Sequence, residues 1–238
     1  MKILILVLLF LTIVSSGCYS VETVESTKIS SADVYQSYDI RADKNRASVT
    51  ATFRVGSKSG ATIDLDAPSK IEYNGKIMTE IAPNGWKGTT YEDSIKKLSG
   101  QHQFVYTDGN GKIFRNDVNF APIEFSETPV KVSRSMRTLI PLSRIVGKDE
   151  TISAFVSGKV KSAKNKANEN SSDSVAINLD SARSALIIEP NDLKKFIGGR
   201  IDLSLTLEKN ESLKQASAKG GDVQISYESQ GISLPVVK

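Results

Sequence analysis

The chain is poor in the residues on which most metal and nucleophile sites depend. Its 238 residues include one cysteine (Cys18), one histidine (His102) and one tryptophan (Trp86). Common zinc sites need several histidine or cysteine ligands, so they are excluded. A disulfide within the chain is excluded too, because Cys18 has no second cysteine to pair with. The fold must therefore be stabilised by burial of apolar surface.

The sequence also lacks the motifs of the common hydrolases. A Ser-His-Asp triad would have to use His102, and there is no Gly-x-Ser-x-Gly elbow. Residues 94–97 match Ser-x-x-Lys, but the companion motifs Ser-Asp-Asn and Lys-Thr-Gly are absent. We therefore expect no enzyme, interpret residues 90–98 as a short helix or loop, and place His102 at a surface or hairpin position beside Phe104.

Calcium ligands are incomplete as well. Residues 108–111, Asp-Gly-Asn-Gly, begin like an EF-hand loop, but Lys112 and Ile113 stand where a further ligand and a glycine are needed. Asp64 and Asp66 are one residue apart, which is typical of the solvent-facing side of a strand. We expect no metal and no cofactor.

The chain has no apolar run long enough to predict a permanent transmembrane helix. Its longest run, residues 3–14, has 12 residues and is interrupted by Thr12, whereas a spanning helix needs about 20. Lys2 precedes this run and the small residues Ser15, Ser16 and Gly17 follow it. This arrangement predicts an export signal over residues 1–17.

The end of that signal, Ser15-Ser16-Gly17-Cys18, resembles the lipobox of bacterial lipoproteins, with Ser15 in the place of the family's usual leucine. The resemblance implies that Cys18 becomes the first residue after cleavage and carries a thioether-linked diacylglycerol and an N-acyl chain. Two or more chains hold a protein on a bilayer stably. Tyr19 stands where the family's retention signal has aspartate, which implies the outer membrane.

The region after Cys18 divides into three expected parts. Residues 18–33 are rich in serine, threonine and charge without a sustained period, which predicts a lipidated, flexible tether with a reach of roughly 20 Å. Residues 34–125 and 126–238 are expected to form two domains. Two prolines and no clear period within residues 121–130 indicate the boundary between them.

Strand patterns dominate the first domain. Apolar and polar residues alternate over residues 47–55, which predicts a strand with one buried face. Asn74-Gly75 between two short strand-like runs predicts a tight hairpin, and residues 107–111 predict a second one.

The second domain shows the same period, most clearly over residues 201–208, and a short helical turn capped by Asn191 is expected at residues 192–197. No long helical pattern occurs. The fold class is therefore all-β, with two tandem Ig-like antiparallel sandwiches, or one larger sandwich as the alternative.

One loop carries the candidate binding residues. Trp86, Lys87 and Tyr91 lie in a stretch rich in glycine and proline that could present aromatic rings to a sugar or anchor a protein partner. The alternative is that Trp86 fills the end of the first sandwich.

A basic run, Lys159, Lys161, Lys164 and Lys166, is either a solvated loop or a contact for anionic headgroups. Nucleic acid is excluded as a partner, because the protein is exported and the run lacks interleaved aromatic residues. We thus expect a membrane-anchored envelope protein with a structural or adaptor role toward a protein partner. The alternative is a module that binds polysaccharide or peptidoglycan through the Trp86 loop.

Overall fold

The computed structural model describes residues 22–84, 87–96, 98–126, 131–160 and 171–238. The N-terminal half contains strands β1 (Thr23–Glu25), β2 (Val34–Ala42), β3 (Ala47–Val55), β4 (Thr62–Asp64), β5 (Lys70–Tyr73), β6 (Lys76–Ile77), β7 (Thr79–Ile81), β8 (Thr90–Ile95), β9 (Gly100–Thr107) and β10 (Ile113–Phe120), with the 3-10 turns η1 (Ser26–Lys28) and η2 (Ser31–Asp33). The C-terminal half contains β11 (Val132–Ser133), β12 (Thr138–Pro141), β13 (Glu150–Val160), β14 (Ser171–Leu179), β15 (Ala185–Ile188), η3 (Pro190–Leu193), β16 (Arg200–Ser212), β17 (Gly221–Glu228) and β18 (Ile232–Val237).

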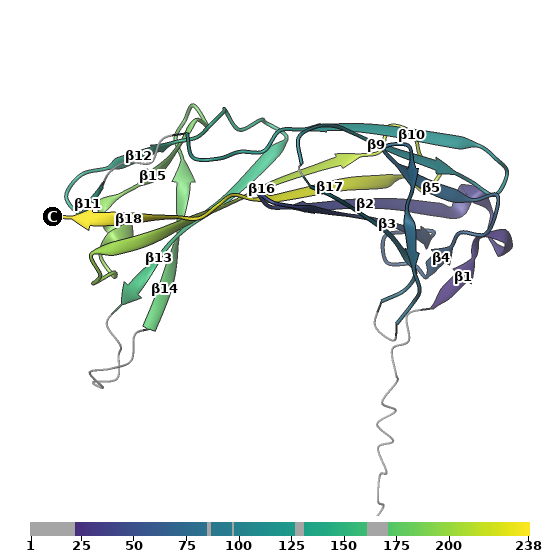
Figure 1. Cartoon of the computed structure of the whole chain (residues 1–238), viewed down its shortest axis with the longest axis horizontal. Coiled ribbons are helices and arrows are strands. Elements are labelled where there is room, and N and C mark those ends of the chain that lie inside the picture. Colours follow the sequence, from purple (N-terminus) through teal and green to yellow (C-terminus); the bar gives the residue numbers. More distant parts are fainter. Residues whose placement is uncertain (1–21, 85–86, 97, 127–130, 161–170) are drawn as a thin grey trace, which may run out of the picture.

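The strands form two bodies that share one long strand (Figure 1). We call β1 to β10 together with β17 the N-terminal body, and β11 to β15 together with β18 the C-terminal body. Strand β16 runs through both, because one of its edges pairs with β18 over residues 200–203 and with β17 over residues 206–212, while its other edge pairs with β13 over residues 202–209. The all-β, sandwich-type fold predicted from the sequence is confirmed.

The N-terminal body is a sandwich of two sheets. Strands β10, β9, β5 and β6 form one sheet, and it packs on the larger sheet that contains β3, β2 and β17. Aromatic rings fill the space between the sheets: Tyr38 of β2 stacks on Phe104 of β9 at 4.3 Å between centroids, and Phe53 of β3 lies 4.5 Å from Tyr106. Burial of these large rings is the main stabilising contribution to this body.

Strand β17 comes from the end of the chain but completes the N-terminal body. It lies between β2 and β16, pairing with β2 in parallel, with Val223 opposite Tyr38 and Ile225 opposite Ile40. Its inward residues Val223, Ile225 and Tyr227 are buried. The hydrogen-bonded sheet therefore crosses the boundary expected between residues 125 and 126.

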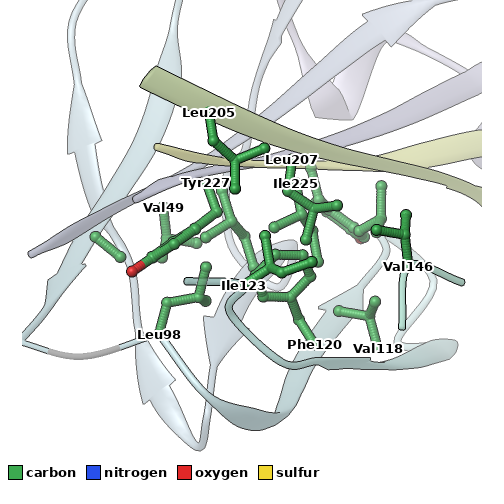
Figure 2. Close-up of a cluster of buried hydrophobic side chains, with 14 of the residues drawn as sticks. Val49, Leu98, Val118, Phe120, Ile123, Val146, Leu205, Leu207, Ile225 and Tyr227 are labelled. Atoms are coloured by element: carbon green, nitrogen blue, oxygen red, sulfur yellow. The ribbon is translucent and has the colours of Figure 1, made fainter. Parts of the chain in front are cut away.

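The expected boundary segment itself is packed rather than open. Ile123 is fully buried, and Phe125 bridges to Leu142. Figure 2 shows Ile123 in a cluster that also contains side chains from β10, β16 and β17, among them Phe120 and Leu207. Ile123 thus belongs to the hydrophobic core and Phe125 packs against it, whereas Ala121 and Ser126 at the ends of this segment are exposed. The remainder of the expected boundary, residues 127–130, lies outside the described residues.

Several local expectations are confirmed. Strand β3 covers residues 47–55 as predicted, with Ala47, Val49, Ala51 and Phe53 buried. Asn74 and Gly75 form the hairpin turn between β5 and β6, and their φ values are 48° and 79°. The second hairpin joins β9 and β10.

Other expectations are wrong. Residues 90–95 of the segment expected as a helix or loop instead form β8, an extended strand that pairs with β3, and residue 97 lies outside the described residues. The short turn near residue 192 begins after Glu189, which caps it together with Asp192, and not after Asn191. Residues 22–33 of the expected tether are ordered, because β1 pairs with β4 and Ile29 packs against the core. No helix among the described residues is long and apolar enough to cross a membrane.

A fragment test follows from the position of β17. Residues 34–125, the first domain expected from sequence, lack β17 and therefore leave β2 with an unpaired edge and an open core. We expect this fragment to show no cooperative urea transition by circular dichroism, whereas residues 22–238 unfold cooperatively. Two-state unfolding of the short fragment would contradict the shared-strand architecture.

Candidate functional site

The outer face of the N-terminal body carries an open hollow of about 580 Å³. Its floor is formed by the outward residues of β2, β3 and β8, because side chains alternate between the two faces of a strand. Most of the lining is hydroxylated or charged, and we call this site the polar hollow: Ser37, Asp39, Arg41, Ser48, Thr50, Thr52, Arg54, Lys58, Thr62, Lys87, Gly88, Thr90 and Glu92.

Strand pairing brings these residues together in rows. Thr50 of β3 stands between Asp39 of β2 and Glu92 of β8. In the next row, Ser48 stands between Arg41 and Ser94. The rows present hydroxyl, carboxylate and guanidinium groups side by side, which is the donor and acceptor inventory that sugar hydroxyls need.

The charges around the hollow are held in pairs. The Arg41 guanidinium donates to both oxygens of Asp39, at 3.1 and 3.3 Å. Lys87 Nζ lies 2.7 Å from Glu92 Oε1. The lining has four basic and two acidic side chains, and Asp222 beside it pairs with Lys58, so the local excess is one positive charge.

At one end of the hollow a carboxylate outside the lining joins two of its residues. Asp222 of β17 accepts from Lys58 Nζ at 2.6 Å and from Ser37 Oγ at 2.8 Å. Tyr35 stands next to this group, and burial together with the negative charge of Asp222 raises the pKa of its hydroxyl. Tyr35 is an aromatic residue that the sequence argument missed, although its outward position in the β2 alternation was readable.

Among the described residues that line the hollow, one buried hydroxyl has no partner. Thr90 is 4% exposed, and its Oγ1 has no hydrogen-bond partner within the described part of the chain. A buried hydroxyl without a partner costs free energy, of the order of 1–3 kcal/mol. Less than 1 Å² of this oxygen is accessible, so a ligand in the hollow would supply the missing hydrogen bond only after the groups that cover Thr90 Oγ1 had moved aside.

The wall of the hollow is built by close packing at Gly88. A Cβ at this position would stand 2.1 Å from Thr62 Oγ1 and 2.8 Å from Thr62 Cβ, so only glycine fits. Asn84 and Lys87 exchange two backbone hydrogen bonds of 2.8 Å at the base of the loop that contains Trp86. This loop therefore joins the body at the hollow.

The predicted binding residues are separated by the structure. Lys87 lines the polar hollow and is half exposed. The expectation that Tyr91 presents its ring to a ligand is wrong, because this side chain is only 5% exposed. Its hydroxyl donates to Asp64 at 3.2 Å and accepts from Leu65 N at 2.7 Å. Residue 91 points inward because its neighbours Thr90 and Glu92 point outward. Trp86 and Cys18 lie outside the described residues.

Two of the three carboxylates considered for calcium, Asp108 and Asp64, have structural partners, whereas the buried Asp66 Oδ2 has none among the described residues. Asp108 is buried and accepts from the backbone N–H groups of Asn110 and Lys112, both at 2.9 Å, which closes the β9–β10 turn. Asp64 accepts the Tyr91 hydroxyl. Within the described ranges, no group of three or more histidine, cysteine or acidic residues is placed to hold a metal ion.

His102 is not at the surface as expected. It lies in β9 of the β9–β10 hairpin but is only 2% exposed, and its Nδ1 is 2.6 Å from the Tyr73 hydroxyl. Burial lowers the pKa of this imidazole. The described contacts make it a core residue of the sandwich.

Comparisons with known proteins give distant likenesses only. No protein-family model matches the sequence, and the search of curated proteins finds no match. Among solved structures, murine CEACAM1b is 12% identical, with a TM-score of 0.25, and the match covers 86% of this chain and 100% of that one. The Bacteroides ovatus mixed-linkage glucan utilization locus protein SGBP-B, solved with a mixed-linkage heptasaccharide, is 11% identical, with a TM-score of 0.21, and the match covers 82% of this chain and 53% of that one.

The buried histidine predicts a pH dependence of stability. Because the folded pKa of His102 lies below its unfolded value of about 6.5, the unfolded chain binds the proton more readily below that pH. We expect the free energy of unfolding to be unaffected by His102 above about pH 6.5 and to fall on acidification, by at most about 1.4 kcal/mol per pH unit. Urea midpoints at pH 7.5 and 5.5 test this.

The matched variant for this test is His102→Gln, which removes the chain's single histidine. Its midpoint is expected to change less than that of the unaltered protein over the same interval. Equal pH slopes in the two proteins would show that His102 does not carry the effect.

Proposed function

We propose that this chain is a lipid-anchored, non-enzymatic protein of the cell envelope that binds a glycan in the polar hollow. The observation that carries the proposal is Thr90, a buried hydroxyl without a partner in the described structure, set in a hollow lined by other hydroxyls and paired charges. Ligand-binding sites obtain their specificity from a small number of polar groups that point toward the same ligand. The anchor at Cys18 and the outer-membrane location follow from the lipobox resemblance and belong to the same proposal.

The Asp39 and Arg41 pair supports a sugar ligand in particular. Both side chains are held in a planar, two-bond arrangement at the floor of the hollow. Planar groups fixed in this way hydrogen-bond adjacent sugar hydroxyls with little loss of side-chain entropy. Tyr35 provides an aromatic side chain beside the same face.

The test uses two neighbouring threonines. Thr90→Val removes the unpartnered hydroxyl without changing the side chain's size. We expect affinity for envelope polysaccharide to fall about five- to ten-fold, as the loss of one hydrogen bond predicts, while stability is kept or rises. Titration followed by Trp86 fluorescence or calorimetry measures the change.

Thr89→Val is the matched control. Thr89 is fully buried and its hydroxyl also has no partner among the described residues, but Thr89 does not line the hollow. It should leave affinity unchanged. Equal affinities for all three proteins, or no binding of any envelope polysaccharide, would contradict the glycan proposal.

A second candidate function, an adaptor for another envelope protein, is favoured by the C-terminal body. This body exposes Met136, Leu139, Phe155 and Ile197, which are 68%, 51%, 41% and 56% accessible. Exposed large apolar side chains are frequent anchors of protein interfaces. Contact with a protein through this body is compatible with glycan binding at the other.

Crosslinking in cells tests the adaptor role. We expect a tagged, lipidated chain to recover an envelope protein reproducibly, and Phe155→Ser to reduce the yield several-fold, because truncating a buried interface anchor costs 2 kcal/mol or more in many complexes. Ile77→Ser is the control, since Ile77 is 62% exposed but lies in the N-terminal body. Equal yields from both variants would argue against an interface at Phe155.

A further inference from the structure

The first described residues are bonded to the wall of the polar hollow. The carbonyl oxygen of Glu22 accepts from Thr62 N at 3.0 Å and from Thr62 Oγ1 at 3.3 Å. The hydroxyls of Thr23 and Thr62 share a further hydrogen bond of 2.8 Å. Because Thr62 itself lines the hollow, the backbone at Glu22 lies one hydrogen bond away from the site.

The residues after Glu22 are fixed to the same body. Strand β1 pairs in parallel with β4, Ser26 Oγ accepts from Asp66 N at 2.8 Å, and Asp33 O accepts from Gly56 N at 2.7 Å. Side chains hold the segment too, because Ile29 packs against the hydrophobic core. Residues 22–33 are therefore held on the N-terminal body and do not lengthen the connection between that body and Cys18.

The connection to the proposed anchor is consequently short. Four chain steps separate Cys18 from Glu22, and at 3.3–3.6 Å per residue they span at most about 14 Å. The headgroup layer of one leaflet is about 5–7 Å thick, half the difference between the whole bilayer and its hydrocarbon core. The wall of the hollow at Thr62, one hydrogen bond from Glu22, is therefore held close to the layer of headgroups.

We propose that the polar hollow binds the sugar headgroup of an anionic glycolipid in the same leaflet that holds the chain's own anchor. This inference rests on the proposed function, both for the lipid at Cys18 and for sugar binding in the hollow. The glycan is then presented on a lipid beside the protein, and the short connection keeps the site at the height of that headgroup.

The chemistry of the lining selects the headgroup and not the acyl chains. The lining has no large aliphatic or aromatic side chain, so an acyl chain would gain no hydrophobic stabilisation there. Serine and threonine hydroxyls suit sugar hydroxyls. The excess of basic over acidic side chains, with Arg41 78% exposed, favours a headgroup that also carries phosphate or carboxylate.

The experiment uses the full lipidated chain in phosphatidylcholine vesicles that contain a phosphorylated glycosyl diacylglycerol with a photoactivatable group on its sugar. Crosslinked peptides are identified by mass spectrometry. We expect crosslinks in β2, β3 and the residues from Lys87 to Glu92, and a lower yield with Thr90→Val. Crosslinks confined to the C-terminal body would overturn the inference.

A spacer variant tests proximity itself. Twenty glycine and serine residues inserted between Val21 and Glu22 lengthen the connection from four to 24 steps. Effective concentration falls with about the −3/2 power of length, so we expect the crosslink yield at limiting glycolipid to fall about 15-fold. Affinity for the water-soluble headgroup should be unchanged, and equal crosslink yields with and without the spacer would overturn the inference.

Two further arms separate this inference from the proposed function. If the soluble headgroup binds in a Thr90-dependent manner but the vesicle glycolipid does not crosslink, sugar binding stands and the membrane-proximal ligand is wrong. The intact mass of the purified protein, compared with Cys18→Ser, reports the anchor directly. A purified chain without added lipid mass would refute both the anchor and this inference. Vesicles that contain the unphosphorylated glycolipid test whether the headgroup must carry an anionic group.

Discussion

The backbone pairing of β17 with β2 and β16 is the interaction on which the rest of the structure depends. It closes the larger sheet of the N-terminal body with residues from the end of the chain, and it places Val223 and Ile225 beside Tyr38 and Ile40. Because β17 also pairs with β16, the same ladder continues into the C-terminal body. Parallel pairing between strands so far apart in sequence makes folding of the first half conditional on the last.

The polar hollow is the other face of that sheet. The strands that bury Tyr38, Ala51 and Phe53 on one side present Ser37, Thr50 and Thr52 on the other. The period-two alternation that specifies the core therefore specifies the site as well. Gly88 and Thr62 add the wall, and Asp222 from β17 orders Lys58 and Ser37 at one end, so the site needs the complete fold.

Local features were predictable because local physics determines them. The alternation at residues 47–55 and the positive φ demanded at Asn74 and Gly75 are readable without any partner strand. Contacts between segments that are far apart in the sequence could not be predicted from it. Nothing in residues 221–228 indicates β2 as their neighbour. Residues 22–33 are ordered by backbone pairing with β4 and by single hydroxyls such as those of Thr23 and Ser26, and no local pattern predicts either.

The candidate binding residues were likewise predictable only in part. Lys87 was identified from its loop and lines the hollow, but Tyr91 was expected to present its ring from the same loop and is instead buried in β8. In a strand, a one-residue difference in position decides between core and solvent. The outward positions Asp39, Arg41 and Thr90 form a site only through the register of three strands. The sequence analysis did not single out Asp39 or Arg41 and expected Thr90 in a short helix or loop, and strand pairing alone brings the three together.

The continuous strand β16 has a mechanical consequence. A pull between an anchor near Glu22 and a partner held by the C-terminal body would pass through the ladders of β2, β17 and β16. Where such a load runs along the strands, a ladder resists in shear, and many hydrogen bonds must break together instead of one after another. With the proposed anchor and partner in place, the molecule would act as a rigid connection between them. Tension would load the strands that form the floor of the polar hollow before either body unfolded.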